Sequence, residues 1–314
     1  MPPIQMTNNI VPSLCCIHNG LKEQGFKFNT MTYAQYKKYG KKTAMKLLAD
    51  RVLNNICLIH LTIKTCAENK WNYRIGSNVF PLMTHPMTFY KIEDLHNADE
   101  IYSEFKWCAN TIKKSKVRCS MHPDQFVVPA SPTPSVRDSA NRELEQHGYI
   151  MDLLELPKSP ESPINIHMNC YNNDDFKAAA DRFIASYDMM TDSVKKRLVL
   201  ECEDKGKSWN TQLLYDYIYK SLGMPITYDS HHHRCGNTYG GLTAEQACDL
   251  ARTTWGKVKP LFHFSNGKAS SSDRAHSDYV YELHPELSKK PTDVDFEFKQ
   301  KEKSITKFTL EFSK

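Results

Sequence analysis

The chain has 314 residues, of which 40% are hydrophobic and 25% are charged, so it is long enough for one barrel-sized domain but not for a second large one. It has no apolar stretch near the ~20 residues that cross a bilayer, and its first residues lack the basic flank and apolar centre of a secretory signal, so we expect an intracellular protein without a membrane span. A net charge of +5 permits a polyanionic partner without requiring one.

Short apolar runs alternate with amphipathic helical patterns along the chain. The predicted strands, in order, are 10–17, 72–76, 118–122, 164–167, 198–201, 226–229, 261–263 and 294–297. The predicted helices between them are 43–67, 99–114, 135–156, 175–190, 211–222 and 243–255. Residues 299–314 alternate charged and apolar groups, and we expect either a terminal helix or a tail there. This alternation of strands and helices predicts a single (β/α)8 TIM barrel over residues 1–314.

The cysteines do not indicate a disulfide framework. Ten of them are scattered along the chain without a C-x-x-C pair, and several fall within apolar or helical patterns, among them Cys57, Cys66, Cys170 and Cys248. We therefore expect reduced and mostly buried thiols.

Six successive strand-like runs end on residues that can bind a metal: His122, His167, Glu201, Asp229, His263 and Glu297. From His167 onward these ends recur at intervals of 34, 28, 34 and 34 residues, each the length of a strand, a helix and two loops. Since the strands of such a barrel are parallel, their carboxyl ends meet at one mouth. Any one of these residues alone could be a polar group on the barrel rim, but six successive ends favour a metal site.

The residue types indicate which metals fit. Imidazole and carboxylate suit Zn²⁺, Mn²⁺ and Fe²⁺, and a carboxylate can bridge two ions, so the mixed set favours a multinuclear centre. His232, within a triple histidine three residues after Asp229, and His276, in a later loop, add further ligands. A triple histidine is otherwise often a solvated loop, and its position beside a strand end is what favours a ligand.

Several motifs, in unbroken order from Tyr73 to Glu302, resemble the UV-damage endonucleases, relatives of endonuclease IV-type barrels. The matching segments include Thr84-His-Pro86, Ser120-Met-His-Pro-Asp-Gln-Phe-Val127, Ser131-Pro-Thr-Pro134, Asp229-Ser-His-His232, Arg274-Ala-His-Ser-Asp-Tyr279 and Val294-Asp-Phe-Glu297. The Ser-Met-His-Pro-x-Gln segment is the most specific of them. The resemblance implies a metal-dependent enzyme that cuts double-stranded DNA immediately 5′ of UV photoproducts, leaves a 3′-hydroxyl, and often acts at abasic sites as well.

The resemblance also implies a role for each ligand. Glu201 resembles the bridging and catalytic carboxylate, His122 and His167 resemble ligands of one ion, and Asp229, His263 and Glu297 resemble ligands of its neighbour. His232 and His276 resemble ligands of a third ion, and the implied cluster is Mn²⁺, with Zn²⁺ as the alternative. His85 matches another histidine of the mouth that contacts phosphate or the attacking water; the alternative is a loop histidine held beside Pro86.

Other residues are implied to contact the DNA. Gln125 and Phe126 resemble a Gln-Tyr pair that fills the gap left by expelled nucleotides, although Phe126 could instead pack under its loop. Arg74 and the lysines near the first helix are weaker candidates for phosphate contacts, and Asn19 is the one plausible counterpart of an asparagine beside the lesion.

Two departures from the family limit the transfer. Many members have a modified lysine near the metals, two residues before the strand-seven histidine, where this chain has Leu261, and the N-terminal Gly-Tyr motif is absent. From the resemblance as a whole we expect a UV-damage endonuclease that acts as a monomer. The alternatives are an abasic-site endonuclease of endonuclease IV type, a xylose-isomerase-like sugar isomerase, and a damage-binding protein that has lost catalysis. The last alternative would be expected to lack some of the metal ligands, and none is missing from the sequence.

Overall fold

Eight parallel strands form the centre of the molecule in the computed structural model, which describes residues 9–170, 175–205, 207–236 and 241–312. The strands are β1 (Ile10–Cys15), β2 (Asn72–Ile75), β3 (Cys119–Met121), β4 (Ile164–Ile166), β5 (Leu198–Glu201), β6 (Ile226–Thr227), β7 (Leu261–Phe264) and β8 (Thr292–Phe296). Each lies within or overlaps a predicted strand. The prediction of eight strands is confirmed.

The strands close into a barrel. Hydrogen-bonded neighbours run in the order β6-β5-β4-β3-β2-β1-β8-β7, and every pairing is parallel. The two ends of this sheet meet where Asp229 bridges to His263 and the His263 N–H donates to the Tyr228 carbonyl at 3.0 Å. The predicted (β/α)8 architecture is therefore confirmed, and all carboxyl ends open on one mouth.

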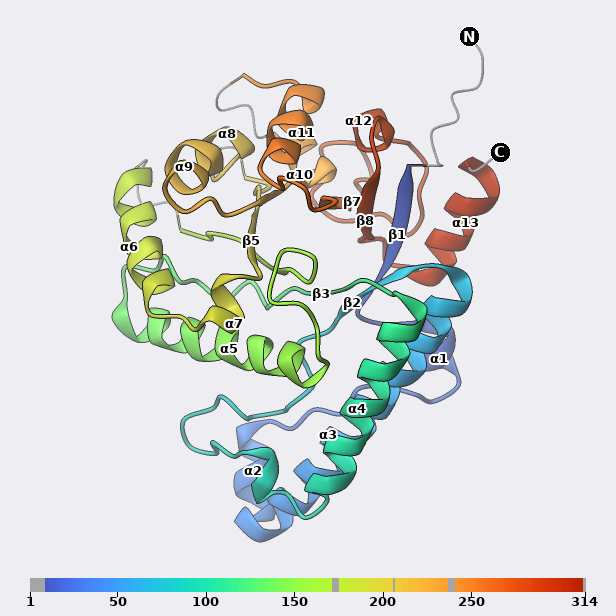
Figure 1. Cartoon of the computed structure of the whole chain (residues 1–314), viewed down its shortest axis with the longest axis vertical. Coiled ribbons are helices and arrows are strands. Elements are labelled where there is room, and N and C mark those ends of the chain that lie inside the picture. Colours follow the sequence, from blue (N-terminus) through green and yellow to red (C-terminus); the bar gives the residue numbers. More distant parts are fainter. Residues whose placement is uncertain (1–8, 171–174, 206, 237–240, 313–314) are drawn as a thin grey trace.

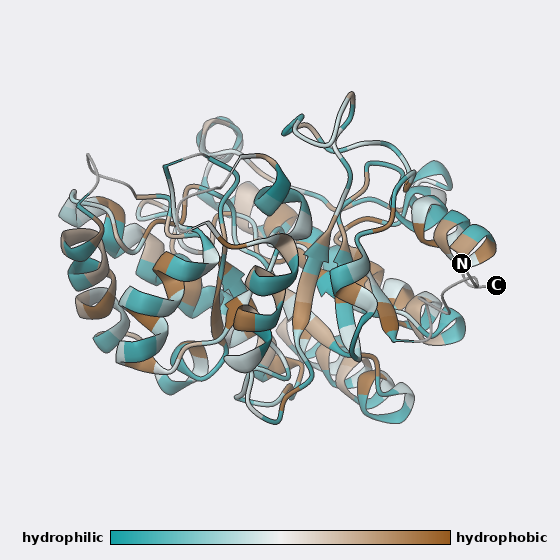
Figure 2. Ribbon diagram, turned by 90° about the horizontal axis from the view of Figure 1, so that it is seen from above, coloured by the Kyte–Doolittle hydropathy of each residue, from teal (hydrophilic) through white to brown (hydrophobic). Residues whose placement is uncertain are grey.

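Helices cover the outside of the barrel (Figure 1). They are α1 (Asn19–Glu23), α2 (Tyr33–Tyr39), α3 (Lys41–Asn69), α4 (Ala98–Ser115), α5 (Pro134–Leu153), α6 (Phe176–Asp188), α7 (Asp192–Lys195), α8 (Thr211–Leu214), α9 (Lys220–Leu222), α10 (Ser230–Arg234), α11 (Ala244–Thr253), α12 (Pro285–Ser288) and α13 (Glu302–Phe312), with a 3₁₀ turn η1 (Ile92–Asp94) and a π-helical segment η2 (Tyr215–Tyr219). Most of them carry both polar and apolar residues (Figure 2), as expected for helices with one face on the strands and the other in solvent. None of the helices described is long and apolar enough to cross a membrane.

The local sequence explains several of these boundaries. Thr32 and Gln35 form a capping box at the start of α2, and Thr243 and Gln246 form another at α11. Pro134 occupies the first turn of α5, where its missing N–H leaves no intrahelical bond unmade. The sequence did not predict α1 and α2, because their segment is polar and short.

Charged side chains close the barrel opposite its mouth. Arg118 donates to Asp293 at 2.8 Å, and the Lys259 ammonium lies 2.5 Å from the other oxygen of the same carboxylate. Asp293 is buried at 2% exposure, so it needs both partners. Residues 293, 295 and 297 follow the two-residue period of a strand, and β8 therefore places three acids along the barrel interior from its base to its mouth.

Candidate metal centre

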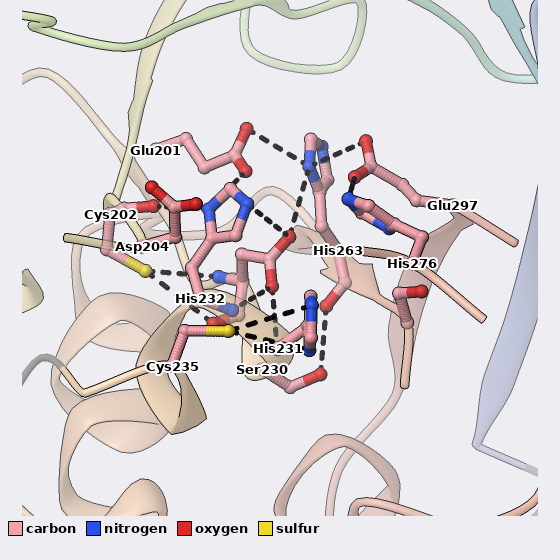
Figure 3. A network of polar contacts seen from close by, with 12 residues as sticks. Glu201, Cys202, Asp204, Ser230, His231, His232, Cys235, His263, His276 and Glu297 are labelled. Carbon is pink, nitrogen blue, oxygen red and sulfur yellow. Dashed lines mark hydrogen bonds and ion pairs between the residues drawn. The ribbon is translucent and has the colours of Figure 1, made fainter. Parts of the chain in front are cut away.

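Glu201, the last residue of β5, lies beside His232 and His263 at the mouth of the barrel (Figure 3), and His122 and His167 also face it. Its Oε2 is 3.1 Å from His122 Nε2, 3.6 Å from His167 Nε2 and 3.0 Å from His263 Nδ1, and its Oε1 is 3.1 Å from His232 Nδ1. The side chain is 1% exposed. One carboxylate therefore faces four imidazoles, which is the arrangement that a bridging ligand needs.

Asp229 is oriented by the helix that it begins. As the N-cap of α10, it accepts hydrogen bonds through Oδ1 from the backbone N–H groups of His231 and His232, at 2.6 and 2.7 Å. This leaves Oδ2 directed at the mouth, 3.9 Å from His263 Nδ1 and 3.8 Å from His232 Nε2. The cap thus fixes a metal-facing oxygen, and the same turn places His232.

Three overlapping groups of side chains could each hold an ion. They are His122–His167–Glu201, Glu201–Asp229–His232 and Asp229–His263–Glu297, and within each group the ligand atoms lie within 4.8 Å of one another. Glu201 is shared by the first two groups, and Asp229 by the last two. The first and third groups are the two ligand sets that the resemblance implied.

His276 lies beside Glu297 and His231. Its Nε2 is 4.0 Å from Glu297 Oε2, and its ring is 5.2 Å from the His231 ring, centroid to centroid. Among the residues that the structure describes, it belongs to none of the three ligand groups, whereas His232 is grouped with Glu201 and Asp229. A joint site of His232 and His276 therefore stays a prediction, and the geometry offers Asp229 as the nearer partner of His232.

Burial and neighbouring charges act in opposite directions on these groups. Burial alone would raise the pKa of Glu201, but the His263 and His167 rings hold it well below its usual range. Burial would lower the pKa of His263, but the Glu201 and Glu297 carboxylates raise it to about 9. Burial lowers the pKa of His167 to about 4, so this ring is neutral and ready to bind a metal.

Buried polar atoms test whether the site suits divalent ions. Asp229 Oδ2 is buried and forms no hydrogen bond with any part of the chain that the structure describes, and its imidazole neighbours are 3.8 and 3.9 Å away. Glu201 Oε1 and His263 Nδ1 are also buried, and their contacts at 3.1 and 3.0 Å are ion pairs without hydrogen-bond geometry. A buried polar atom without a partner costs about 1–3 kcal/mol. Mn²⁺ or Zn²⁺ would bind imidazole nitrogens and carboxylate oxygens directed at a common centre, so these residues fit a divalent metal ion.

Two supporting residues escaped the sequence analysis. Asn165 Nδ2 donates to Glu201 Oε2, and Asp295 Oδ2 lies 3.5 Å from His263 Nε2. Both residues come two positions before a predicted ligand on the same strand, namely His167 and Glu297. Because side chains two apart on a strand share a face, this spacing was the available signal.

Arg74 lies beneath the mouth and faces inward. Its guanidinium is paired with Glu297 and lies 3.6 Å from Asp295 Oδ2, and its side chain is 11% exposed. It therefore holds a candidate ligand in place, and the expectation of a phosphate contact stays a prediction.

His85 lies beside the ligand cluster. Its ring stacks on Tyr33 at 4.5 Å between centroids, and its Nδ1 accepts a hydrogen bond from the Met87 N–H at 3.2 Å. His85 and His122 line one cavity of about 480 Å³, to which Asp124 and Glu143 also contribute. This cavity connects His85 to the metal side of the mouth.

Gln125 and Phe126 lie on the loop that follows His122. Phe126 is 76% exposed, so its ring does not pack under the loop, and the Gln125 carbonyl accepts a hydrogen bond from Asn169 Nδ2 at 2.9 Å. Asn19 is held at the start of α1, where its backbone N–H donates to Glu302 Oε2 at 2.8 Å. Gln125 and Phe126 are therefore exposed on their loop, whereas Asn19 is anchored to the C-terminal helix.

Comparison with known proteins supports a DNA-directed activity. A family described as "UV-endonuclease UvdE" matches residues 13–314. The UV DNA damage endonuclease of Nostoc sp. PCC 7120 is 28% identical over 96% of this chain and 90% of its own length, and the UV-damage endonuclease of Schizosaccharomyces pombe is 29% identical over 92% of this chain and 48% of its own.

Solved structures share the fold. The structure titled SacUVDE superposes with a TM-score of 0.76 at 23% identity, over 96% of this chain and 98% of its own. Endonuclease IV from Thermus thermophilus superposes with a TM-score of 0.55 at 11% identity, over 80% and 93% of the two chains. At these identities the structures support the barrel alone, and the evidence for function comes from the family match.

Proposed function

The chain belongs to the UV-endonuclease UvdE family and is a UV-damage endonuclease, and we propose that it hydrolyses the phosphodiester immediately 5′ of a UV photoproduct, leaving a 3′-hydroxyl. The observation that supports this reaction best is the set of three ligand groups that share Glu201 and Asp229. Three groups favour three ions, and the histidine and carboxylate donors favour Mn²⁺, with Zn²⁺ as the alternative.

The residues of the mouth have different roles in the proposed reaction. Glu201 joins the first two ligand groups, and His122, His167, His263 and Glu297 fix its surroundings. Divalent ions held there would lower the pKa of a bound water and neutralise charge on the phosphate and the departing 3′ oxygen. No nucleophilic side chain is then required. We propose that His85, which lines one cavity with His122, contacts the phosphate or the attacking water.

We further propose that Gln125 and Phe126 probe the duplex. An exposed aromatic ring next to the ligand His122 is suited to fill the space that an expelled dinucleotide leaves in the stack. A damaged step stacks poorly and so costs less to open, which makes weak stacking part of the selectivity. The partner is therefore double-stranded DNA that contains UV lesions.

The alternatives predict other substrates. An abasic-site endonuclease would need no photoproduct, and a sugar isomerase on the same barrel would leave an exposed Gln125–Phe126 pair without a role. The family match favours the photoproduct reaction over both. We include abasic sites as a secondary substrate, because they require no bulky lesion to be accommodated.

The test is metal-dependent incision by the wild-type chain and by Glu201→Gln. We expect the metal-stripped wild type to regain incision of a UV-irradiated duplex when Mn²⁺ is restored, and a well-folded Glu201→Gln protein to bind less metal and not to cut. Glu155→Gln serves as the matched control, because it removes an exposed carboxylate that pairs with Lys106 outside the mouth, and it should cut normally. Near-normal cutting by folded Glu201→Gln would contradict the shared-ligand mechanism.

A further inference from the structure

A second cluster of metal-binding side chain types lies outside the barrel, between α3 and α4. Its members are His60 and Cys57 on α3 and Glu104 and Cys108 on α4. The two helices run side by side over the strands (Figure 1). None of the four residues belongs to the ligand groups of the mouth.

The spacing places each pair of side chains on one face of its helix. Glu104 and Cys108 are four residues apart on α4, and Cys57 and His60 are three apart on α3, so each pair shares one helix face. His60 Nδ1 lies 2.5 Å from Glu104 Oε1, and the ligand atoms of His60, Glu104 and Cys108 lie within 4.8 Å of one another. Cys57 lies on α3 about one turn before His60, is exposed, and is not one of these three residues.

The hydrogen bonds around His60 indicate a cation. Thr111 donates its hydroxyl proton to the Trp107 carbonyl at 2.9 Å, so its Oγ1, 3.0 Å from His60 Nε2, accepts the proton of that nitrogen. In a neutral ring, Nδ1 then presents a lone pair to the Glu104 carboxylate. At 2.5 Å the two atoms share a proton in a charge-assisted hydrogen bond. A metal ion bound by both residues would replace this proton and hold the two ligand atoms farther apart.

Cys108, the third residue of the cluster, favours a metal ion over a proton. The buried Cys108 thiol donates to the Ile56 carbonyl at 3.9 Å, and its sulfur also lies within 4.8 Å of the ligand atoms of His60 and Glu104, where a divalent ion would use it as a third ligand. A histidine that binds a metal usually donates its other N–H to a fixed acceptor, which is the contact that His60 makes with Thr111. Mixed nitrogen, oxygen and sulfur donors suit Zn²⁺.

We propose that His60, Glu104 and Cys108, with Cys57 as fourth ligand, form a structural zinc site that clamps α3 to α4. The site is separate from the catalytic centre and does not depend on the proposed function. Because its thiol must lose a proton to bind, zinc uptake there releases protons.

Cobalt titration of the full, metal-stripped chain tests this site, because Co²⁺ bound by thiolate absorbs in the near ultraviolet and the ligand groups described at the mouth contain no cysteine. We expect a thiolate band in the wild type that Zn²⁺ displaces and that Cys108→Ala removes. Cys66→Ala is the matched control, since it removes an equally buried thiol of α3 and should keep the band. Cys108→Ser provides a second variant of similar size if the alanine protein does not fold.

The Glu104→Gln variant distinguishes a bound zinc ion from a proton shared by His60 and Glu104. The amide can still hydrogen-bond His60 but is a poor metal ligand, so zinc affinity should fall by at least about tenfold while the helices persist. Incision of UV-damaged DNA by Cys108→Ala should equal that of the wild type, which distinguishes failure of this site from failure of the proposed function. The zinc site is overturned by a wild type without a thiolate band, by a band that Cys108→Ala leaves intact, or by unchanged zinc affinity in Glu104→Gln.

Discussion

Asp295 Oδ2 lies 3.5 Å from His263 Nε2, on the side of the imidazole away from Glu201. Asp295 is 1% exposed, and Arg74 lies 3.6 Å from the same oxygen. A carboxylate behind a metal-binding histidine fixes which ring nitrogen holds the proton and raises the basicity of the other. Asp295 is thus placed to orient His263 without touching a metal or the DNA.

Replacing this carboxylate should weaken the metal centre. We expect Asp295→Asn to lower metal affinity by about 10–100-fold, with a matching rise in the metal concentration needed for incision. Equilibrium dialysis and incision at graded Mn²⁺ measure both. Asp293→Asn is the control, because it removes a buried acid one layer lower on β8, where it pairs with Arg118 and Lys259. It should lower stability and leave metal affinity unchanged; equal metal loss in both variants would contradict an orienting role.

The pKa of His263 predicts how pH acts on the metal-free protein. Its folded pKa is raised from 6.5 to about 9, so the protonated ring contributes stability that is fully present below pH 6.5 and is lost as the pH rises to about 9. A metal requires the neutral ring, so metal affinity should increase over the same window. Thermal unfolding of the metal-free chain at pH 6.5 and 9 tests the predicted fall in stability, and Mn²⁺ binding at the same two pH values tests the predicted rise in metal affinity. His263→Asn should lack this part of the stability change, and a wild-type affinity that falls with pH would contradict the assignment.

The loop after β3 should affect DNA binding and leave the metal in place. We expect the double variant Gln125→Ala with Phe126→Ala to weaken binding to a UV-damaged duplex by about 5–100-fold, since a base stacked on an aromatic ring contributes about 1–3 kcal/mol. Bound metal should be unchanged. Phe89→Ala removes another exposed aromatic ring, 66% exposed, in a different loop and should bind normally. Metal loss with intact lesion discrimination would instead assign the pair to support of the site.

The sequence predicted the barrel because the strands are short, apolar and regularly spaced. Strand ends carry the ligands, and parallel strands bring such ends together whatever their separation along the chain. This is why His122 and Glu297, 175 residues apart, could be expected at one mouth. The resemblance then assigned His122 and His167 to one group, and the geometry places them so.

Other features depend on contacts that a strand pattern does not encode. His276 lies in a loop whose course is set by its bridge to Gly267, so its distance from His232 could not be read from spacing. Arg74 resembles a phosphate contact in sequence, but its pairing with Glu297 depends on β2 and β8 lying on the two sides of β1, an order that the strand pattern does not encode. Asn165 and Asp295 interrupt apolar strands, and only the closed barrel shows which ligands they support.

Incision of four matched duplexes tests the central claim most directly. A cyclobutane dimer, a 6-4 photoproduct, an abasic site and undamaged DNA are placed in one sequence context with Mn²⁺, and the ends of each product are mapped. The candidate metal ligands are all present, whereas the N-terminal motif of the family is altered. We therefore expect cutting immediately 5′ of the dimer with a 3′-hydroxyl, and a shifted preference between the two photoproducts. We also expect cutting at the abasic site and none of the undamaged duplex. Cutting of the abasic duplex alone, or aldose isomerisation without any nicking, would contradict the account.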